Sequence, residues 1–151
     1  SRRASLRLDL APNVVVPLQR EAFRQVLLNL LDNAVKYGPA GQTITIGLSL
    51  AGSLARVMVS DEGPGVPPAE RHAIWTPFFR GNAAAAQGTG GSGIGLAIVR
   101  DVVATMGGRI SLTEPATGQG AAFVVELPGA QRVDDAVPAD DVDGALSLRP
   151  S

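Results

Sequence analysis

The sequence contains no cysteine and only one histidine, His72, among its 151 residues. Without cysteine the chain has no disulfide framework and no thiolate metal site, which fits a reducing compartment. One histidine cannot supply the several imidazole ligands of a zinc centre. Metal sites built from thiolates or from several imidazoles are therefore excluded.

Long apolar runs and a strong charge imbalance are also missing. No stretch approaches the roughly 18 apolar residues of a membrane-spanning helix, and the start of the chain shows no secretory signal pattern. The formal net charge is only −1, which gives no indication of a nucleic-acid partner. We therefore expect a cytoplasmic α/β domain, alone or within a longer protein, with no nucleic-acid partner and no membrane contact of its own.

Up to residue 128 the chain shows a regular succession of strand and helix patterns. Alternating or β-branched runs predict strands, and apolar residues that recur every three or four positions predict helices. Pro17 confines its strand to a sheet edge or marks a strand end, and Gly38-Pro39 ends the first helix. The expected elements are strands at 5–10 and 13–18, a helix at 19–37, an antiparallel hairpin that turns at 51–53, a short helix at 67–75, a long mobile loop at 80–93, a helix at 94–108, and strands at 109–114 and 121–128.

This order predicts one domain, residues 1–128, with an α/β (α+β) fold: a two-layer sandwich in which a mixed β-sheet packs against three helices. Residues 129–151 have a different composition, with five aspartates, two arginines and no aromatic residue. Their net charge is −3, against +2 for the rest of the chain. We expect them to form an acidic, proline-containing and poorly structured C-terminal extension.

The segment "NLLDNAVKYG" places polar side chains on one stripe of the first helix. Residues at spacings of four, seven and eight share a helix face, and here they are Asn29, Asn33, Lys36 and Tyr37. A buried amide without a partner costs about 1–3 kcal/mol, so amides that face inward are expected to meet a polar group. An amide oxygen is a suitable ligand for Mg²⁺, and Lys36 supplies charge for a phosphate. The alternative is a solvent-facing stripe of an amphipathic helix.

Two glycine-containing segments follow. "DEGPGVP" (61–67) comes directly after a strand, where Asp61 can accept a hydrogen bond from an exocyclic amine such as that of adenine, and its glycines allow close backbone approach. An ordinary Asp-Gly turn is the alternative. "GTGGSGIGLAIV" (88–99) opens a helix, whose backbone amides suit a phosphate. Its G-x-G-x-x-G pattern is not a dinucleotide fingerprint, because no strand precedes it, and no P-loop motif occurs.

The order and spacing of these segments resemble the ATP-binding domain of sensor histidine kinases. This is the Bergerat nucleotide fold, which gyrase B subunits, MutL proteins and heat-shock chaperone ATPases share. The resemblance covers about residues 5–128. It rests on an N box at "NLLDNAVKYG", a G1 box at "DEGPGVP", an F box at "TPFFRG", a G2 box at "GGSGIGLAIV" and a weaker last box at "GQGAAF". The implied cofactors are ATP and Mg²⁺, and the loop at 80–93 is implied to be a lid over the nucleotide.

The resemblance also implies roles for single residues. Asn33 is implied to be the Mg²⁺ ligand that bridges to the ATP phosphates, with Lys36 near the phosphates and Tyr37 near the base and ribose. Asp61 is implied to read the adenine amino group. The other positions implied to contact the nucleotide or to begin the lid are Gly63, Gly65, Val66, Phe79, Arg80, Gly91, Ser92, Gly93, Ile94, Gly95 and Leu96.

Asn29 is the position at which this chain differs from the hydrolysing relatives, which carry a glutamate there. An amide cannot take a proton at neutral pH, so Asn29 and Asn33 are expected to form a catalytic pair that holds ATP and presents its γ-phosphate elsewhere. Asn29 as a second amide that only forms a hydrogen bond or helps to hold the metal is the alternative. A further departure is "GAAF" (120–123), which has alanines where the family often has a hydroxyl residue near the adenine.

The implied function is that of a protein-histidine kinase of a two-component system. The implied partners are a dimerisation domain that carries the phosphoacceptor histidine, and a response regulator, within a membrane-anchored parent. Two alternatives remain open: a Bergerat-fold serine kinase of the anti-sigma type, and a nucleotide-binding regulatory module without phosphotransfer. "HAIWTP" resembles a phosphoacceptor signature, but Ala73 stands where an acidic residue would orient the imidazole. We therefore predict no catalytic role for His72.

Overall fold

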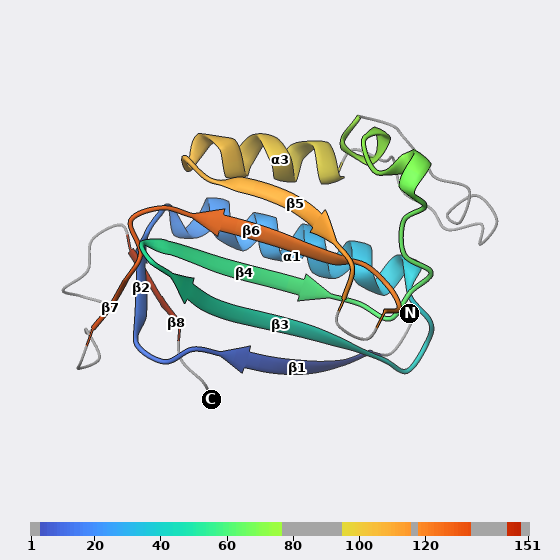
Figure 1. Ribbon diagram of the computed structural model, residues 1–151, viewed down its shortest axis with the longest axis horizontal. Coiled ribbons are helices and arrows are strands. Elements are labelled where there is room, and N and C mark those ends of the chain that lie inside the picture. The colour runs from blue at the N-terminus through green and yellow to red at the C-terminus, as the bar shows by residue number, and fades with distance from the viewer. Residues whose placement is uncertain (1–3, 77–94, 116–117, 134–144, 149–151) are drawn as a thin grey trace.

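The computed structural model describes residues 4–76, 95–115, 118–133 and 145–148. Five strands form the main sheet in the order β1-β3-β4-β6-β5. β1 pairs parallel to β3, and the other neighbours are antiparallel, so the sheet is mixed as expected (Figure 1). The strands are β1 (Ala4–Leu10), β3 (Gln42–Ala51), β4 (Leu54–Ser60), β5 (Arg109–Thr113) and β6 (Ala122–Leu127).

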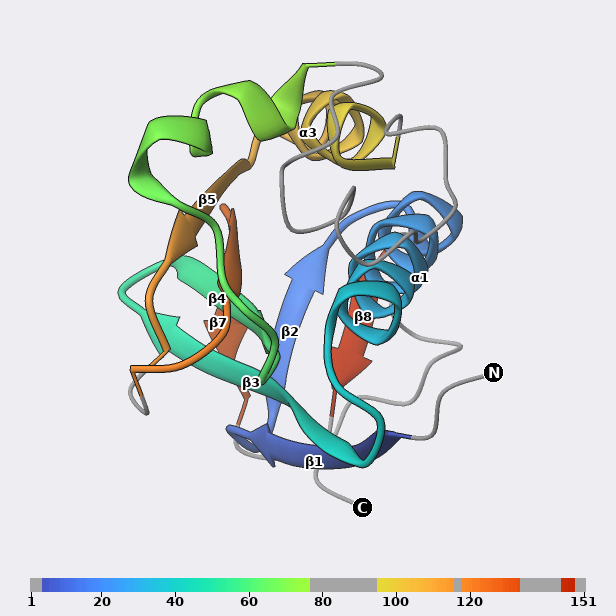
Figure 2. The ribbon, with the colours of Figure 1, turned by 90° about the vertical axis from the view of Figure 1, so that its right-hand side faces the viewer.

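Two α-helices, α1 (Arg20–Tyr37) and α3 (Gly95–Thr105), lie side by side on one face of this sheet (Figure 2). α1 turns a stripe of apolar residues at spacings of three and four toward the sheet, namely Phe23, Val26, Leu30 and Ala34, all of which are buried. They join Val57, Val59 and Val125 from the central strands in one hydrophobic core. Burial of each large side chain contributes about 1.5–3 kcal/mol, so this packing fixes α1 on the sheet.

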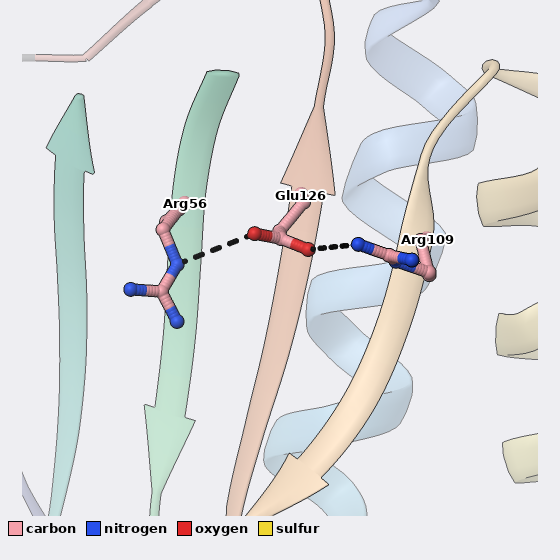
Figure 3. Close-up of polar contacts among 3 residues, drawn as sticks. All are labelled: Arg56, Arg109 and Glu126. Carbon is pink, nitrogen blue, oxygen red and sulfur yellow. Dashed lines mark hydrogen bonds and ion pairs between the residues drawn. The ribbon is translucent and has the colours of Figure 1, made fainter. Parts of the chain in front are cut away.

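The opposite face of the sheet carries a cluster of three charged residues. Glu126 of β6 stands between Arg56 of β4 and Arg109 of β5, and its carboxylate contacts both guanidinium groups, at 3.5 Å and 3.2 Å (Figure 3). Both arginines are well exposed, so these contacts add little to stability. Within the described residues, no helix has both the length and the apolar character that crossing a membrane requires.

Glycine ends α3. Gly107 has a left-handed backbone (φ 75°), and the N–H of Gly108 donates to the carbonyl of Val103 at 3.0 Å. This is the hydrogen-bond pattern of a Schellman cap. The cap turns the chain directly into β5, which pairs with β6 in the sheet.

The expected short helix at 67–75 is instead two 3₁₀ helices, Pro68–Glu70 and Ala73–Trp75. Their hydrogen bonds span three residues, as in the bond from the Glu70 N–H to the Pro67 carbonyl at 2.8 Å. Among the described residues, two of the three expected helices are therefore α-helices. The expected loop at 80–93 lies outside the described residues.

A second, three-stranded sheet has the order β7-β2-β8. β2 (Val14–Pro17) ends at Pro17, as predicted, and lies between β7 (Gln131–Arg132) and β8 (Ala145–Leu148), both antiparallel to it. The prediction of a poorly structured extension is wrong for these two segments. Their pairing partner is more than 100 residues earlier in the sequence, and composition alone does not reveal such a distant partner.

Candidate functional site

Asp61 leaves the end of β4 and is held by backbone groups of two loops. Its Oδ1 accepts hydrogen bonds from the N–H groups of Gly63, at 2.9 Å, and Ala121, at 3.1 Å. Its own N–H donates to the Ala121 carbonyl at 2.9 Å. The residue is only 8% exposed, and this burial raises the pKa of its carboxyl, while the two backbone hydrogen bonds partly offset the rise.

The second carboxylate oxygen of Asp61, Oδ2, accepts no hydrogen bond from the described residues. No fully buried side-chain oxygen in this part of the chain lacks a partner. The arrangement sets the orientation of the carboxylate through Oδ1, and no described residue donates to Oδ2.

The glycines around Asp61 are required by close backbone contacts. Gly120 has φ 93°, and a Cβ there would collide with the Asp61 backbone carbonyl. A Cβ on Gly63 would lie 3.0 Å from the Tyr37 carbonyl, and one on Gly65 (φ 76°) would lie 2.9 Å from the Gly120 carbonyl. Gly63 and Gly65 are thus required by contacts within the protein, and their contact with a nucleotide stays a prediction.

A cavity of about 530 Å³ opens beside this loop. It is lined by the end of α1 and by the residues that follow Asp61, with one further residue from the loop before β6. The lining residues are Tyr37, Gly38, Pro39, Ala40, Glu62, Gly63, Pro64 and Gln119. The cavity therefore brings the end of the N box and the G1 box together at one opening.

The other predicted residues of α1 lie along its length. Asn29 and Asn33 are half-buried and flank the buried stripe on one side. Lys36 forms an ion pair with Asp32, one turn earlier, at 3.0 Å. Both partners of this pair are well exposed, so it is weak and leaves the ammonium group able to turn toward an anion.

The remaining predicted residues divide into two groups. Val66 and Leu96 are half-buried against the core, and Gly95 is exposed as the first residue of α3. Outside the described residues lie Phe79, Arg80, Gly91, Ser92, Gly93 and Ile94.

The sequence reasoning did not identify Gln42, whose side chain is 3% exposed and bonds to the residue that follows Asp61. The sequence did contain a signal for a buried role of Gln42, because Gln42 shares a strand face with the buried Ile44 and Leu48. A polar residue on the apolar face of a strand needs a buried partner.

The oxygen atoms of this site suit a hard cation that receives most of its coordinating oxygens from a bound phosphate compound. The described residues contain no cluster of three or more histidine, cysteine or acidic side chains that could hold a metal by themselves. The amide oxygens of Asn29 and Asn33 offer neutral oxygen ligands, which fit Mg²⁺ when phosphate oxygens complete its shell. The residues that are present therefore fit a magnesium–nucleotide complex.

Comparison with known proteins gives consistent matches. A family model described as histidine kinase-, DNA gyrase B- and HSP90-like ATPase matches residues 19–131. The signal transduction histidine-protein kinase/phosphatase MprB of Mycolicibacterium vanbaalenii is 40% identical over 136 residues, which cover 85% of this chain and 27% of that relative. The chain thus spans about a quarter of the length of this curated relative.

Solved structures agree. A mycobacterial sensor histidine kinase, MprB, superposes with a TM-score of 0.70 at 35% identity, over 83% of this chain and 82% of that chain. Full-length ShkA in complex with AMPPNP superposes with a TM-score of 0.67 at 31% identity, over 86% of this chain and 27% of that chain.

Proposed function

Because this chain belongs to the family of histidine kinase-, DNA gyrase B- and HSP90-like ATPases, we propose that it binds Mg-ATP and donates the γ-phosphoryl group to a histidine on a separate domain. The resemblance to histidine kinase catalytic domains that the sequence boxes suggest is confirmed. The predicted two-layer fold with a mixed sheet is confirmed as well.

The geometry of Asp61 is the observation that carries this proposal. Oδ1 is fixed by the amides of Gly63 and Ala121, and no described residue donates to Oδ2, so we expect Oδ2 to accept from the ligand. An adenine amino group is a hydrogen-bond donor that could bind to Oδ2, and the bound AMPPNP of ShkA is an adenine nucleotide. Tyr37, at the cavity beside Asp61, then lies near the base and ribose.

The phosphate end of the nucleotide would lie along α1 and the start of α3. Asn33 would hold Mg²⁺ through its amide oxygen, and Lys36 would leave its weak pair with Asp32 to meet the phosphates. When bound, Mg²⁺ supplies charge neutralisation for the transferred phosphoryl group. Backbone amides from Gly91 to Leu96 would face the phosphates at the N-terminal end of α3.

Asn29 suits transfer and not hydrolysis. Its amide cannot remove a proton from water, so ATP would persist until a histidine approaches. The imidazole nitrogen of that histidine would form the new P–N bond as the bond to the ADP oxygen breaks and ADP leaves, and the imidazole would then release its proton to water. The acceptor histidine would lie on the dimerisation domain of the parent kinase, and a response regulator would receive the phosphoryl group. The parent would be membrane-anchored, with this domain in the cytoplasm.

Calorimetry combined with phosphotransfer tests the proposal. Mg-ATP should bind to the purified chain, and release of inorganic phosphate should be negligible. With γ-labelled ATP and a helical phosphoacceptor domain added in trans, acid-labile label should appear on the added domain. Sustained phosphate release would contradict the role of Asn29. Acid-stable label on a serine would favour the anti-sigma type of kinase, and binding without any transfer would favour a regulatory module.

A further inference from the structure

The ladder between β3 and β4 stops just before the loop that carries Asp61. Thr45 and Ser60 are its last paired positions, and in the same register Thr43 would lie opposite Glu62. On the β6 side the pairing continues for one residue, since the Asp61 N–H donates to the Ala121 carbonyl at 2.9 Å. The loop that carries Asp61 is thus held by backbone bonds on one side only.

Two side chains bridge the gap on the other side. The Gln42 Nε2 donates to the Ala34 carbonyl in the last turns of α1, at 2.8 Å, and its Oε1 accepts from the Glu62 N–H at 3.0 Å. Glu62 in turn bonds to the next residue of β3, because its Oε1 accepts from the Thr43 N–H at 2.6 Å. We call this set of three hydrogen bonds the Gln42 brace. It joins the end of α1 to the residue next to Asp61.

The strength of the brace depends on the burial of Gln42. Gln42 is 3% exposed, and both ends of its amide are used, so neither bond can be replaced by water without opening the structure. Gly38, the cap of α1, is close as well: a Cβ there would collide with the Gln42 side chain. Tyr37, Gly38, Glu62 and Gly63 all line the same cavity, so the brace sets the distance between its two walls.

We propose, resting on the proposed function, that Gln42 is a positioning residue for the adenine end of the nucleotide site. It holds the Glu62 backbone against the end of α1, and so fixes the Asp61 carboxylate relative to Tyr37. Gln42 itself is buried behind the loop and does not touch the nucleotide. Its loss should therefore weaken binding of the base and leave the Mg²⁺-dependent contacts at the phosphates unchanged.

The substitution Gln42→Met tests this, because methionine keeps the length of the side chain and removes both hydrogen bonds. The matched control is Gln131→Met, the same change at an exposed position of β7. Calorimetry with ADP, and with ATP in the presence and absence of Mg²⁺, should show an affinity loss of roughly ten-fold, as expected for one or two lost hydrogen bonds. The loss should be equal for all three, and absent in the control.

Hydrogen exchange of the nucleotide-free protein gives a readout that does not depend on binding. The Glu62 amide should exchange faster in Gln42→Met than in Gln131→Met. If Gln42→Met fails to fold, Glu62→Ala removes the exposed half of the brace and should also weaken ADP binding, and Glu62→Gln, which keeps an acceptor oxygen, should recover most of that loss.

The outcomes separate the two proposals. If the wild-type chain and Gln131→Met bind no adenine nucleotide, the proposed function is wrong. If both bind and a folded Gln42→Met binds ADP equally well, only the positioning role is wrong. A loss confined to ATP with Mg²⁺ would also overturn it, because that result would place the effect of Gln42 at the phosphates.

Discussion

Asp61 and Ala121 lie 60 positions apart in the sequence and exchange two hydrogen bonds. The Ala121 N–H donates to the Asp61 Oδ1 at 3.1 Å, and the Asp61 N–H donates to the Ala121 carbonyl at 2.9 Å. The carboxylate that we propose to recognise adenine is thus also a structural tie between the loops after β4 and before β6. Substitutions at this residue should separate the two roles.

Replacing Asp61 by asparagine should remove function and preserve the fold. Asparagine keeps an oxygen for the amides of Gly63 and Ala121, but it presents NH₂ in place of Oδ2 toward the adenine amino group. Asp61→Ala leaves both backbone amides unpaired, at about 1–3 kcal/mol each. Urea unfolding and ADP calorimetry should show that both variants lose binding and that only Asp61→Ala loses stability. Wild-type ADP affinity in Asp61→Asn would refute the assignment.

The wild type and Asp61→Asn should also differ in how their free energy of unfolding depends on pH. Burial raises the pKa of Asp61 above 3.8 in the folded state, so the folded protein binds this proton more tightly than the unfolded chain. The contribution of Asp61 to the free energy of unfolding therefore grows as pH falls through the folded-state pKa, and is unfavourable above it. Asp61→Asn should exceed the wild type in stability at neutral pH, and the difference should shrink as pH falls toward 3.8. A difference that widens with acid would contradict the raised pKa.

Gly120 and Gly118 form a matched pair of left-handed glycines in the loop before β6. Alanine at Gly118 (φ 78°) has open space around its Cβ, so it should cost about 1 kcal/mol of stability from backbone strain alone. Alanine at Gly120 would also meet the Asp61 backbone, and should cost clearly more stability and weaken ADP binding. Thermal unfolding and calorimetry of the two variants measure this difference. Equal losses of stability and of ADP affinity in the two variants would show that contact with the Asp61 backbone adds nothing to the cost of alanine at Gly120.

Asn33 is predicted to govern the response to Mg²⁺. Asn33→Ala should lower the affinity for ATP in the presence of Mg²⁺ to nearly the value measured with a chelator, because it removes the oxygen ligand. Asn33→Asp keeps an oxygen and should keep a response to Mg²⁺. Titrations of each variant with and without the metal decide the matter, and an unchanged Mg²⁺ dependence in Asn33→Ala would exclude Asn33 as a ligand.

His72 should be irrelevant to phosphotransfer. It is exposed and immediately precedes the 3₁₀ helix Ala73–Trp75 within the ATP-binding domain itself, and Ala73 offers no acidic partner. With γ-labelled ATP and an added phosphoacceptor domain, His72→Ala should transfer label at the wild-type rate, with no label on this chain. Acid-labile label on the wild-type chain that disappears in His72→Ala would assign it a phosphoacceptor role.

Local patterns predicted the parts of the fold that depend on local contacts. The helix at 19–37 and the hairpin around 51–53 follow from the spacing of apolar residues and from turn residues, and the structure has both. The tight loops around Asp61 were anticipated as glycine positions, but the Asp61–Ala121 exchange was not, because it depends on pairing between β4 and β6. Gln42 was missed since its partners lie in other elements. Residues 131–132 and 145–148 were interpreted as part of an acidic tail, because the strand that pairs with them, β2, is far away in the sequence.

The position of β2 between β7 and β8 has a consequence for synthesis. Val14, Val15 and Val16 are synthesised more than 100 residues before the strands that pair with them. Until then a buried run of three β-branched side chains has no strand on either edge. Contacts of such long sequence separation form slowly, so the small sheet is completed only after all strands of the main sheet have been made. The stretch around Val15 is where a nascent or truncated chain would be most exposed to chaperone capture or aggregation.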